Sequence, residues 1–160
     1  MERYQKIAKH KKFKKYIAKI KKLEENRIYC HHDVTHLLDV GRIAYIRALE
    51  KHLPLSKDMI YAAALLHDIG KVKQYNKKIP HEIGGLPIAK KVLVDCGYHN
   101  EEIAVILEAI RFHRRGMEGG TNLLGQLLYE ADKGSRLCMF CEGRKSCNWT
   151  KEEKNSRIEY

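Results

Sequence analysis

The stretch from Tyr61 to Lys71 carries two adjacent polar side chains, His67 and Asp68, in an otherwise apolar pattern. The apolar residues recur at helical spacing, which predicts a buried helix. A buried carboxylate is costly unless a charge or hydrogen bonds compensate it. A divalent metal is one such compensation, because neutral histidine and ionised aspartate are both metal ligands. The alternative is a histidine–carboxylate pair that satisfies itself in the core, and this helix alone leaves both interpretations open.

Further metal-ligand residues lie at the ends or apolar edges of other predicted helices. They are His36, His81, His113 and Asp132. Ligands that converge from separate helices of a bundle are a known way to build a metal site. His31 and His32 are rivals to His36, but only His36 falls inside the apolar pattern of its helix.

The order of these residues resembles the HD superfamily of metal-dependent phosphohydrolases. The sequence Leu-Leu-His-Asp-Ile-Gly-Lys at 65–71 is close to the central signature of that family. His36, with apolar helical neighbours, precedes this motif, and the Ala131-Asp132 pair follows it. The resemblance covers about residues 28–136. The sequence contains no alternating, strand-like segment of any length, which predicts an all-α fold and an irregular helical bundle. The resemblance implies that this bundle is of the HD-domain type.

The resemblance also implies a ligand set. By position, a first metal would be held by His36, His67, Asp68 and Asp132. Branches of the superfamily with two metals have additional histidines, and His81 and His113 occupy matching places. Asp68 would then bridge the two metals and take part in catalysis. Fe, Mn, Co and Zn all suit such ligands, and the sequence does not choose among them.

The implied reaction is attack of metal-activated water on phosphorus, as a phosphomonoesterase or a phosphodiesterase. The substrate would be a nucleotide or another small phosphoester. Lys71 is the catalytic candidate beside the metals, because it could approach a phosphate or protonate a leaving oxygen. Lys71 is also a candidate to bind phosphate, together with Arg114, Lys133 and Arg136. The family's cyclic-dinucleotide phosphodiesterases have Gly-Tyr-Pro after the last histidine, whereas Arg114-Arg115-Gly116 stands here, which counts against that substrate.

The polar C-terminal segment contains a second cluster of candidate ligands. Cys138, Cys141 and Cys147 are closely spaced there and have little packing reason to be present. Cys30 could supply a fourth thiolate if this segment folds back across the start of the second helix. Such a set would bind zinc or an iron–sulfur cluster. Free thiols are the alternative, and Cys96 falls on an apolar helix face that predicts a core position.

The length of 160 residues fits one domain with a full core. The formal net charge is +11, and residues 1–28 hold eleven Lys or Arg against three Glu. We predict a basic amphipathic N-terminal helix at 1–27, a metal-binding domain at 28–136 and a cysteine-containing tail at 137–160. The basic helix could bind nucleic acid, anionic lipid or a polyanionic substrate, or it could be a solvated face.

The coarse pattern predicts helices joined by short loops. We expect one helix from Tyr4 to Leu23, and another from Asp58 to Ile69 that Ser56 caps. A polar loop should follow Gly70 through Lys78, and a glycine-rich loop at Gly116 to Thr121 should precede the last helix.

The chain shows no apolar run of bilayer length and no signal-peptide core, which predicts a cytoplasmic protein without a membrane span. In that compartment cysteines are thiols or metal ligands rather than disulfides. Two rival functions remain: a non-catalytic metal- or nucleotide-binding regulator, and an RNA-associated protein that uses the lysine-rich helix. Oligomeric state and pathway are left open.

Overall fold

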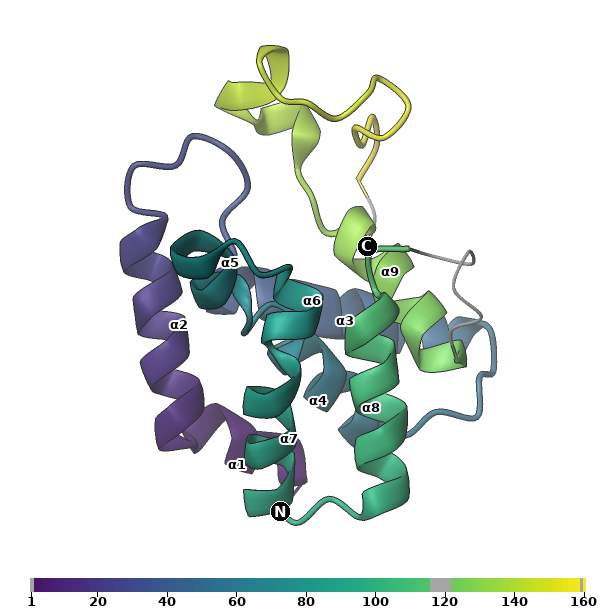
Figure 1. The fold of residues 1–160 in the computed structure, drawn as a ribbon. Coiled ribbons are helices and arrows are strands. Elements are labelled where there is room, and N and C mark those ends of the chain that lie inside the picture. Colours follow the sequence, from purple (N-terminus) through teal and green to yellow (C-terminus); the bar gives the residue numbers. More distant parts are fainter. Residues whose placement is uncertain (1, 116–121, 159) are drawn as a thin grey trace.

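The structure is a computed structural model that describes residues 2–115, 122–158 and 160. Over these residues it is all-α, as predicted, and contains no strand (Figure 1). In chain order the α-helices are α1 (Arg3–Lys9), α2 (Lys11–Leu23), α3 (Val34–Glu50), α4 (Lys57–Leu66), α5 (Lys71–Lys77), α6 (His81–Gly84), α7 (Leu86–Asp95), α8 (Asn100–Phe112) and α9 (Leu123–Gly134). Two short 3-10 helices follow, η2 (Cys138–Phe140) and η3 (Glu142–Lys145). The glycine-rich loop predicted at Gly116 to Thr121 lies outside the described residues.

Helix α4 forms the centre of the core. Its residues 62–66 are buried on every side, and it packs against α1, α3, α8 and α9. The side chain of Ser56 accepts a hydrogen bond from the backbone N–H of Met59 and caps the helix, as predicted. Because α4 is fixed by four neighbours, the polar residues at its C-terminal end are held in place. None of the described helices combines the length and the apolar character needed to cross a bilayer.

The basic N-terminal segment is two helices, so the prediction of one helix from Tyr4 to Leu23 was wrong. The backbone of His10 is extended, with φ −67° and ψ 129°, and it ends α1 and begins α2. The break allows Ile7 on one helix and Phe13 on the other to be buried in the same core. Arg3 adds ion pairs to Asp58 and to Glu102 (2.8 and 2.6 Å), which fasten α1 to α4 and α8.

The polar loop predicted after Gly70 is a helix, α5. Its one buried apolar residue, Val72, belongs to the face that meets α2 and α6, and this packing outweighs the polar composition. Lys78 ends α5 in the left-handed region, with φ 59°. The correction matters for the site, since it places Lys71 at the first position of a helix.

The C-terminal tail, residues 137–160, folds back beside the loop that follows α2 (Figure 1). The side-chain amide of Asn155 donates to the backbone carbonyls of Lys133, Gly134 and Arg136, at 2.8, 3.3 and 2.6 Å. The bonds to Lys133 and Gly134 satisfy carbonyls at the end of α9 that the helix itself leaves free. The tail is thereby fixed against the helix end that carries Asp132.

Candidate metal centre

The six predicted histidine and aspartate ligands meet at one end of α4. They come from the first turn of α3 (His36), the end of α4 and the turn after it (His67 and Asp68), the start of α6 (His81), the end of α8 (His113) and the last turns of α9 (Asp132). All except Asp132 are buried. They form three overlapping groups, in each of which one ligand atom per residue lies within 4.8 Å of the others.

The two carboxylate oxygens of Asp68 face different histidines. Oδ2 lies 3.1 Å from Nε2 of His67 and 3.4 Å from Nε2 of His36. Oδ1 lies 3.2 Å from Nε2 of His81. Asp132 lies on the same side as Oδ2 of Asp68, because its Oδ1 is 3.2 Å from Nε2 of His36. Asp68 therefore stands between two sets of ligand atoms.

Hydrogen bonds to backbone carbonyls orient two of the histidine rings. Nδ1 of His67 lies 2.8 Å from the carbonyl oxygen of Ala64, and Nδ1 of His113 lies 2.6 Å from that of Ile110. Because a carbonyl oxygen only accepts, Nδ1 carries a proton in both rings, so Nε2 is the nitrogen that has a lone pair for the cluster once the ring is neutral. His81 is oriented by Gln74, whose Oε1 is 2.5 Å from Nδ1 of His81.

Two buried atoms of the cluster lack a hydrogen-bond partner among the described residues: Nε2 of His67 and Oδ2 of Asp68. Leaving a buried polar atom unpaired costs about 1–3 kcal/mol. Nε2 of His81 and Nε2 of His113 also face each other at 3.2 Å. A cation between such atoms satisfies all of them, so the donor set and its unpaired atoms fit divalent metal.

Burial and charge set the protonation of the ligands. Burial alone would raise the pKa of Asp68, but His67 and His32 hold it well below its usual range. Burial opposes the charge of His67, yet Asp68 and Asp132 raise the pKa of His67 to about 10. Burial lowers the pKa of His81 to about 2. His81 is therefore neutral at pH 7, whereas His67 would have to release a proton to bind a metal.

Four residues of the cluster line a cleft of about 320 Å³: Asp68, His81, His113 and Asp132. Three of the four predicted phosphate-binding residues line this cleft: Lys71, Arg114 and Arg136. Burial lowers the pKa of the Lys71 amine. Lys133 is not among the lining residues, and its Nζ lies 4.9 Å from the ring centroid of Trp149. Other basic residues of the lining are Arg27, Arg144 and Lys154.

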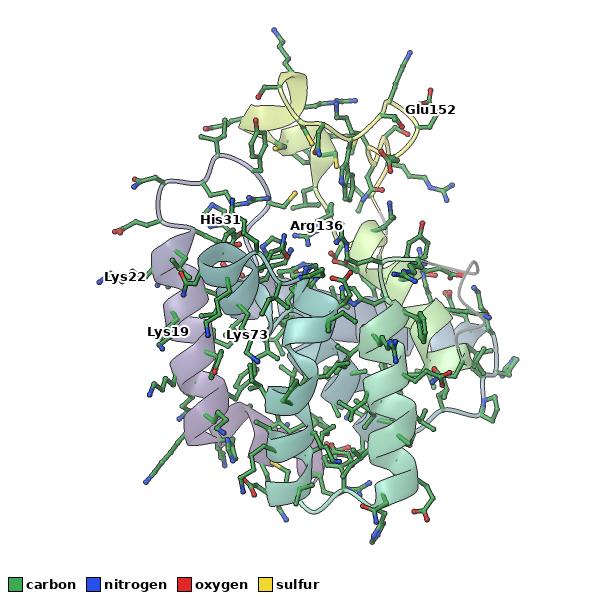
Figure 2. All side chains as sticks on the ribbon, viewed as in Figure 1. Lys19, Lys22, His31, Lys73, Arg136 and Glu152 are labelled. Carbon is green, nitrogen blue, oxygen red and sulfur yellow. The ribbon has the colours of Figure 1, made fainter. Side chains whose placement is uncertain are left out.

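Arg136 is in direct contact with the cluster. Its Nη2 lies 3.1 Å from Nε2 of His36 and 3.1 Å from Oδ1 of Asp132, and its Nη1 donates to the carbonyl of His31. Figure 2 shows Arg136 between the end of α9 and the loop that carries His31. The guanidinium thus places positive charge next to two of the predicted ligands.

Sequence reasoning missed a buried group beside the cluster. Glu24, with 1% of its surface exposed, accepts hydrogen bonds from the backbone N–H of His32 and from the hydroxyl of Tyr75, and contacts Nδ1 of His32 at 2.5 Å. Burial would raise the pKa of Glu24, but these hydrogen bonds lower it to about 2. His32 is thereby held at the cleft wall, and the ligand groups contain His36 instead. The sequence signal was weak, since Glu24 follows a run of exposed lysines.

Residues 33–137 match the HD domain. The chain belongs to the HD domain family. It is 41% identical over its full length to an uncharacterised protein of Clostridium beijerinckii, of which it covers 100%. It is 32% identical over 104 residues to ribonuclease Y 1 of Pediococcus pentosaceus, but it spans only 18% of that protein.

The fold of this HD domain protein is also similar to a solved structure, the crystal structure of a predicted HD superfamily hydrolase from an uncultured Thermotogales bacterium. The TM-score is 0.60 at 25% identity, over 77% of this chain and 70% of the other. Together with the histidine–aspartate groups, the family indicates a hydrolase that depends on a divalent metal.

Proposed function

We propose that this HD domain protein is a phosphohydrolase that acts on a nucleotide or another small phosphoester with two metal ions. The observation that carries the proposal is the position of Asp68, which lines a basic cleft and whose two oxygens face different histidines. His36, His67, Asp68 and Asp132 would hold one ion, and Asp68, His81 and His113 the other. Two such ions supply a water nucleophile and neutralise charge on the phosphoryl oxygens.

The side chains around the cluster would handle the substrate. Arg136 is mostly buried and has five N–H donors, which suits bidentate binding of phosphate oxygens. Its present partners, His36 and Asp132, are themselves predicted ligands, so metal binding would free Nη2 for the phosphate. Lys71 lies in the cleft with a lowered pKa, which favours transfer of its proton to a leaving oxygen at neutral pH.

The dimensions of the cleft favour a small substrate. Its volume of about 320 Å³ is at the lower end of the range for small-molecule sites, about 300–1,000 Å³. Tyr29 and Trp149 line it and offer ring faces on which a base can stack. A phosphate beside the histidine–aspartate cluster and a base on one of these rings would describe a mononucleotide or one half of a dinucleotide.

The test is turnover of a panel of phosphoesters by protein loaded separately with Mn, Fe, Co and Zn. The panel should contain nucleoside mono-, di- and triphosphates, linear dinucleotides, cyclic dinucleotides and a chromogenic phosphodiester. We expect metal-dependent hydrolysis of at least one small phosphoester, with loss of about 10²-fold or more in Asp68→Asn. Saturable nucleotide binding without turnover under every metal would instead support the regulator.

RNA is a second candidate substrate, favoured by the similarity to ribonuclease Y 1 and by the basic α1–α2 segment. Lysines of this segment are exposed, and Figure 2 shows Lys19 and Lys22 pointing away from the molecule. An RNA-binding role predicts affinity that falls steeply with salt and survives His67→Gln and Asp68→Asn. A ribonuclease would also cleave RNA, and that cleavage would be lost in both variants.

A further inference from the structure

Four of the five cysteines line the same cleft, although they come from opposite ends of the chain. Cys30 lies in the loop after α2, and the other three, Cys138, Cys141 and Cys147, lie in the C-terminal tail. We propose that these four thiolates bind one zinc ion that fastens the tail over the cleft. This proposal goes beyond the hydrolase function and does not depend on any turnover.

Contacts on both sides of Cys30 bring the two segments together. The hydroxyl of Tyr29 lies 3.3 Å from both the carbonyl oxygen and Oγ of Ser146, the residue before Cys147. On the other side, the carbonyl of His31 accepts a hydrogen bond from Arg136, two residues before Cys138. These contacts place Cys30 opposite residues 136–146, which contain Cys138 and Cys141 and end next to Cys147.

Gly143 shows how closely the backbones approach. A Cβ atom at this position would lie 2.9 Å from the ring of Tyr29 and 3.1 Å from the carbonyl oxygen of Ile28. A side chain there would push the tail away from the loop. The glycine between Cys141 and Cys147 therefore permits the approach that a shared metal requires.

The local backbone suits metal-binding thiols. Cys138 and Cys141 are separated by two residues, a spacing found in zinc sites, and the 3-10 turn between them is closed by a bond from the N–H of Cys141 to the carbonyl of Cys138 (3.4 Å). Cys30, Cys138 and Cys141 line the same cleft as the guanidinium of Arg136. A cation stabilises neighbouring thiols as thiolates.

The tail has little else to hold its interior together. Its large apolar side chains are mostly exposed, including Leu137 (63%), Phe140 (71%) and Ile158 (66%). The described residues of the tail that are buried are Cys138 and Gly143. Short segments without a hydrophobic core are commonly stabilised by a metal or a cross-link. Cys138 thus takes the place of a buried apolar residue in the tail, and Cys30, Cys141 and Cys147 are half-buried around it.

Zinc binding would require the four sulfur atoms to move closer together than they are in this structure. Among the described residues, groups of three or more ligand atoms within 4.8 Å of one another are found at the histidine–aspartate centre and not among the cysteines. Zinc–sulfur bonds are about 2.3 Å long. Cys141 and Cys147 lie outside regular helix, at the ends of 3-10 and turn segments, where the chain can shift without breaking a helix.

The first test is the zinc content and zinc coordination of full-length protein purified without chelator. X-ray absorption at the zinc edge separates sulfur ligands from nitrogen and oxygen ligands. We expect one equivalent of sulfur-ligated zinc in wild type, and its loss in Cys141→Ser and in Cys147→Ser. Cys96→Ala is the matched control, because Cys96 is buried on another helix face, and Asp68→Asn should also keep the sulfur-ligated zinc. Absence of sulfur-ligated zinc from wild type, or its retention in both serine variants, would overturn the proposal, as would iron with acid-labile sulfide.

A second measurement applies if the serine variants do not fold. Thiol reactivity and trypsin cleavage of wild-type protein are followed before and after addition of a chelator. We expect the tail cysteines to react, and the tail to be cut at sites such as Arg144 and Lys151, in step with zinc release. Thiols that react at the same rate with and without chelator would contradict the zinc site.

Discussion

Gly70 lies so close to the backbone of His81 that no side chain fits between them. A Cβ atom on Gly70 would be 2.0 Å from the carbonyl oxygen of His81 and 2.5 Å from the backbone nitrogen of Gly85. This approach places the start of α6 against the turn that carries Asp68. The distance between Asp68 and His81, and hence the second set of candidate ligand atoms, depends on Gly70, which has no side chain that could bind a metal.

We expect Gly70→Ala to move α6 away from the turn and to weaken metal binding at His81. Overpacking of this kind costs about 1–3 kcal/mol of stability. Gly97→Ala is the control: Gly97 has φ 85°, so alanine strains the backbone, but nothing lies within 4 Å of the new atom. Both variants should lower the melting temperature, and only Gly70→Ala should lower the metal content. Equal metal content in the two would contradict the role given to Gly70.

Lys133 lies in the last turn of α9 and Arg136 follows two residues after its end, so the pair compares a basic residue inside the cleft with one outside it. Arg136 lines the cleft, whereas Lys133 contacts the tail. We expect Arg136→Gln to raise KM by roughly 10- to 100-fold, the loss of one charge-assisted hydrogen bond of about 1.5–3 kcal/mol. Lys133→Gln should change KM by less than about threefold. Steady-state kinetics on the substrate from the panel decides, and equal effects would remove Arg136 from the substrate site.

Lys71 offers a test of proton transfer. Removal of a general acid typically lowers kcat by about 10²- to 10⁴-fold. We expect Lys71→Met to lose activity in this range with metal content unchanged, and Lys77→Met, on the exposed end of the same helix, to retain it. The loss should be smaller for substrates whose leaving group needs no proton. An equal loss for good and poor leaving groups would show that Lys71 binds phosphate instead.

The ion pairs of Arg3 predict a contribution to acid stability. Hydrogen bonds from Arg3 lower the pKa of Glu102 to about 2 from its ordinary value of 4.5. The ionised carboxylate therefore stabilises the fold above pH 4.5, and this contribution is lost as the pH falls towards 2. We expect Glu102→Gln to be less stable than wild type at about pH 6 and to approach wild type below about pH 3.

Urea unfolding at the two pH values measures this difference. Glu101→Gln is the matched control, because Glu101 is exposed in the same first turn of α8. A free energy difference between Glu102→Gln and wild type that does not change with pH would contradict the assignment. So would the same pH dependence in Glu101→Gln.

The sequence predicted the fold class and the proximity of the six candidate ligands, because apolar patterns tied several of them to helices and the family resemblance placed His81 and His113. His67 follows an apolar run, and Asp132 follows Leu127, Leu128 and Ala131, all of which are buried. Periodicity of this kind reports which face of a helix enters the core. The family resemblance added the order of the ligands, and the match over residues 33–137 confirmed the family.

The errors fell where tertiary packing overrides local composition. The break at His10 and the helix at 71–77 both allow apolar residues to be buried. These few apolar residues are surrounded by lysines in the sequence, so hydrophobic periodicity does not reveal them. The burial of Glu24 was not predicted, because its partners His32 and Tyr75 are 8 and 51 residues away in the sequence. The close approach of Gly70 to His81 likewise depends on two backbones that meet only in the folded protein.

The central claim is that Asp68 bridges two metal ions, and counting metal equivalents tests it most directly. Wild type, His81→Gln and Asp68→Asn are purified without chelator, with circular dichroism as the check on folding, and His32→Gln serves as the control at the cleft wall. Relative to wild type, we predict the loss of one equivalent in His81→Gln, of two in Asp68→Asn and of none in His32→Gln. Folded Asp68→Asn protein with the metal content of wild type would contradict the bridge.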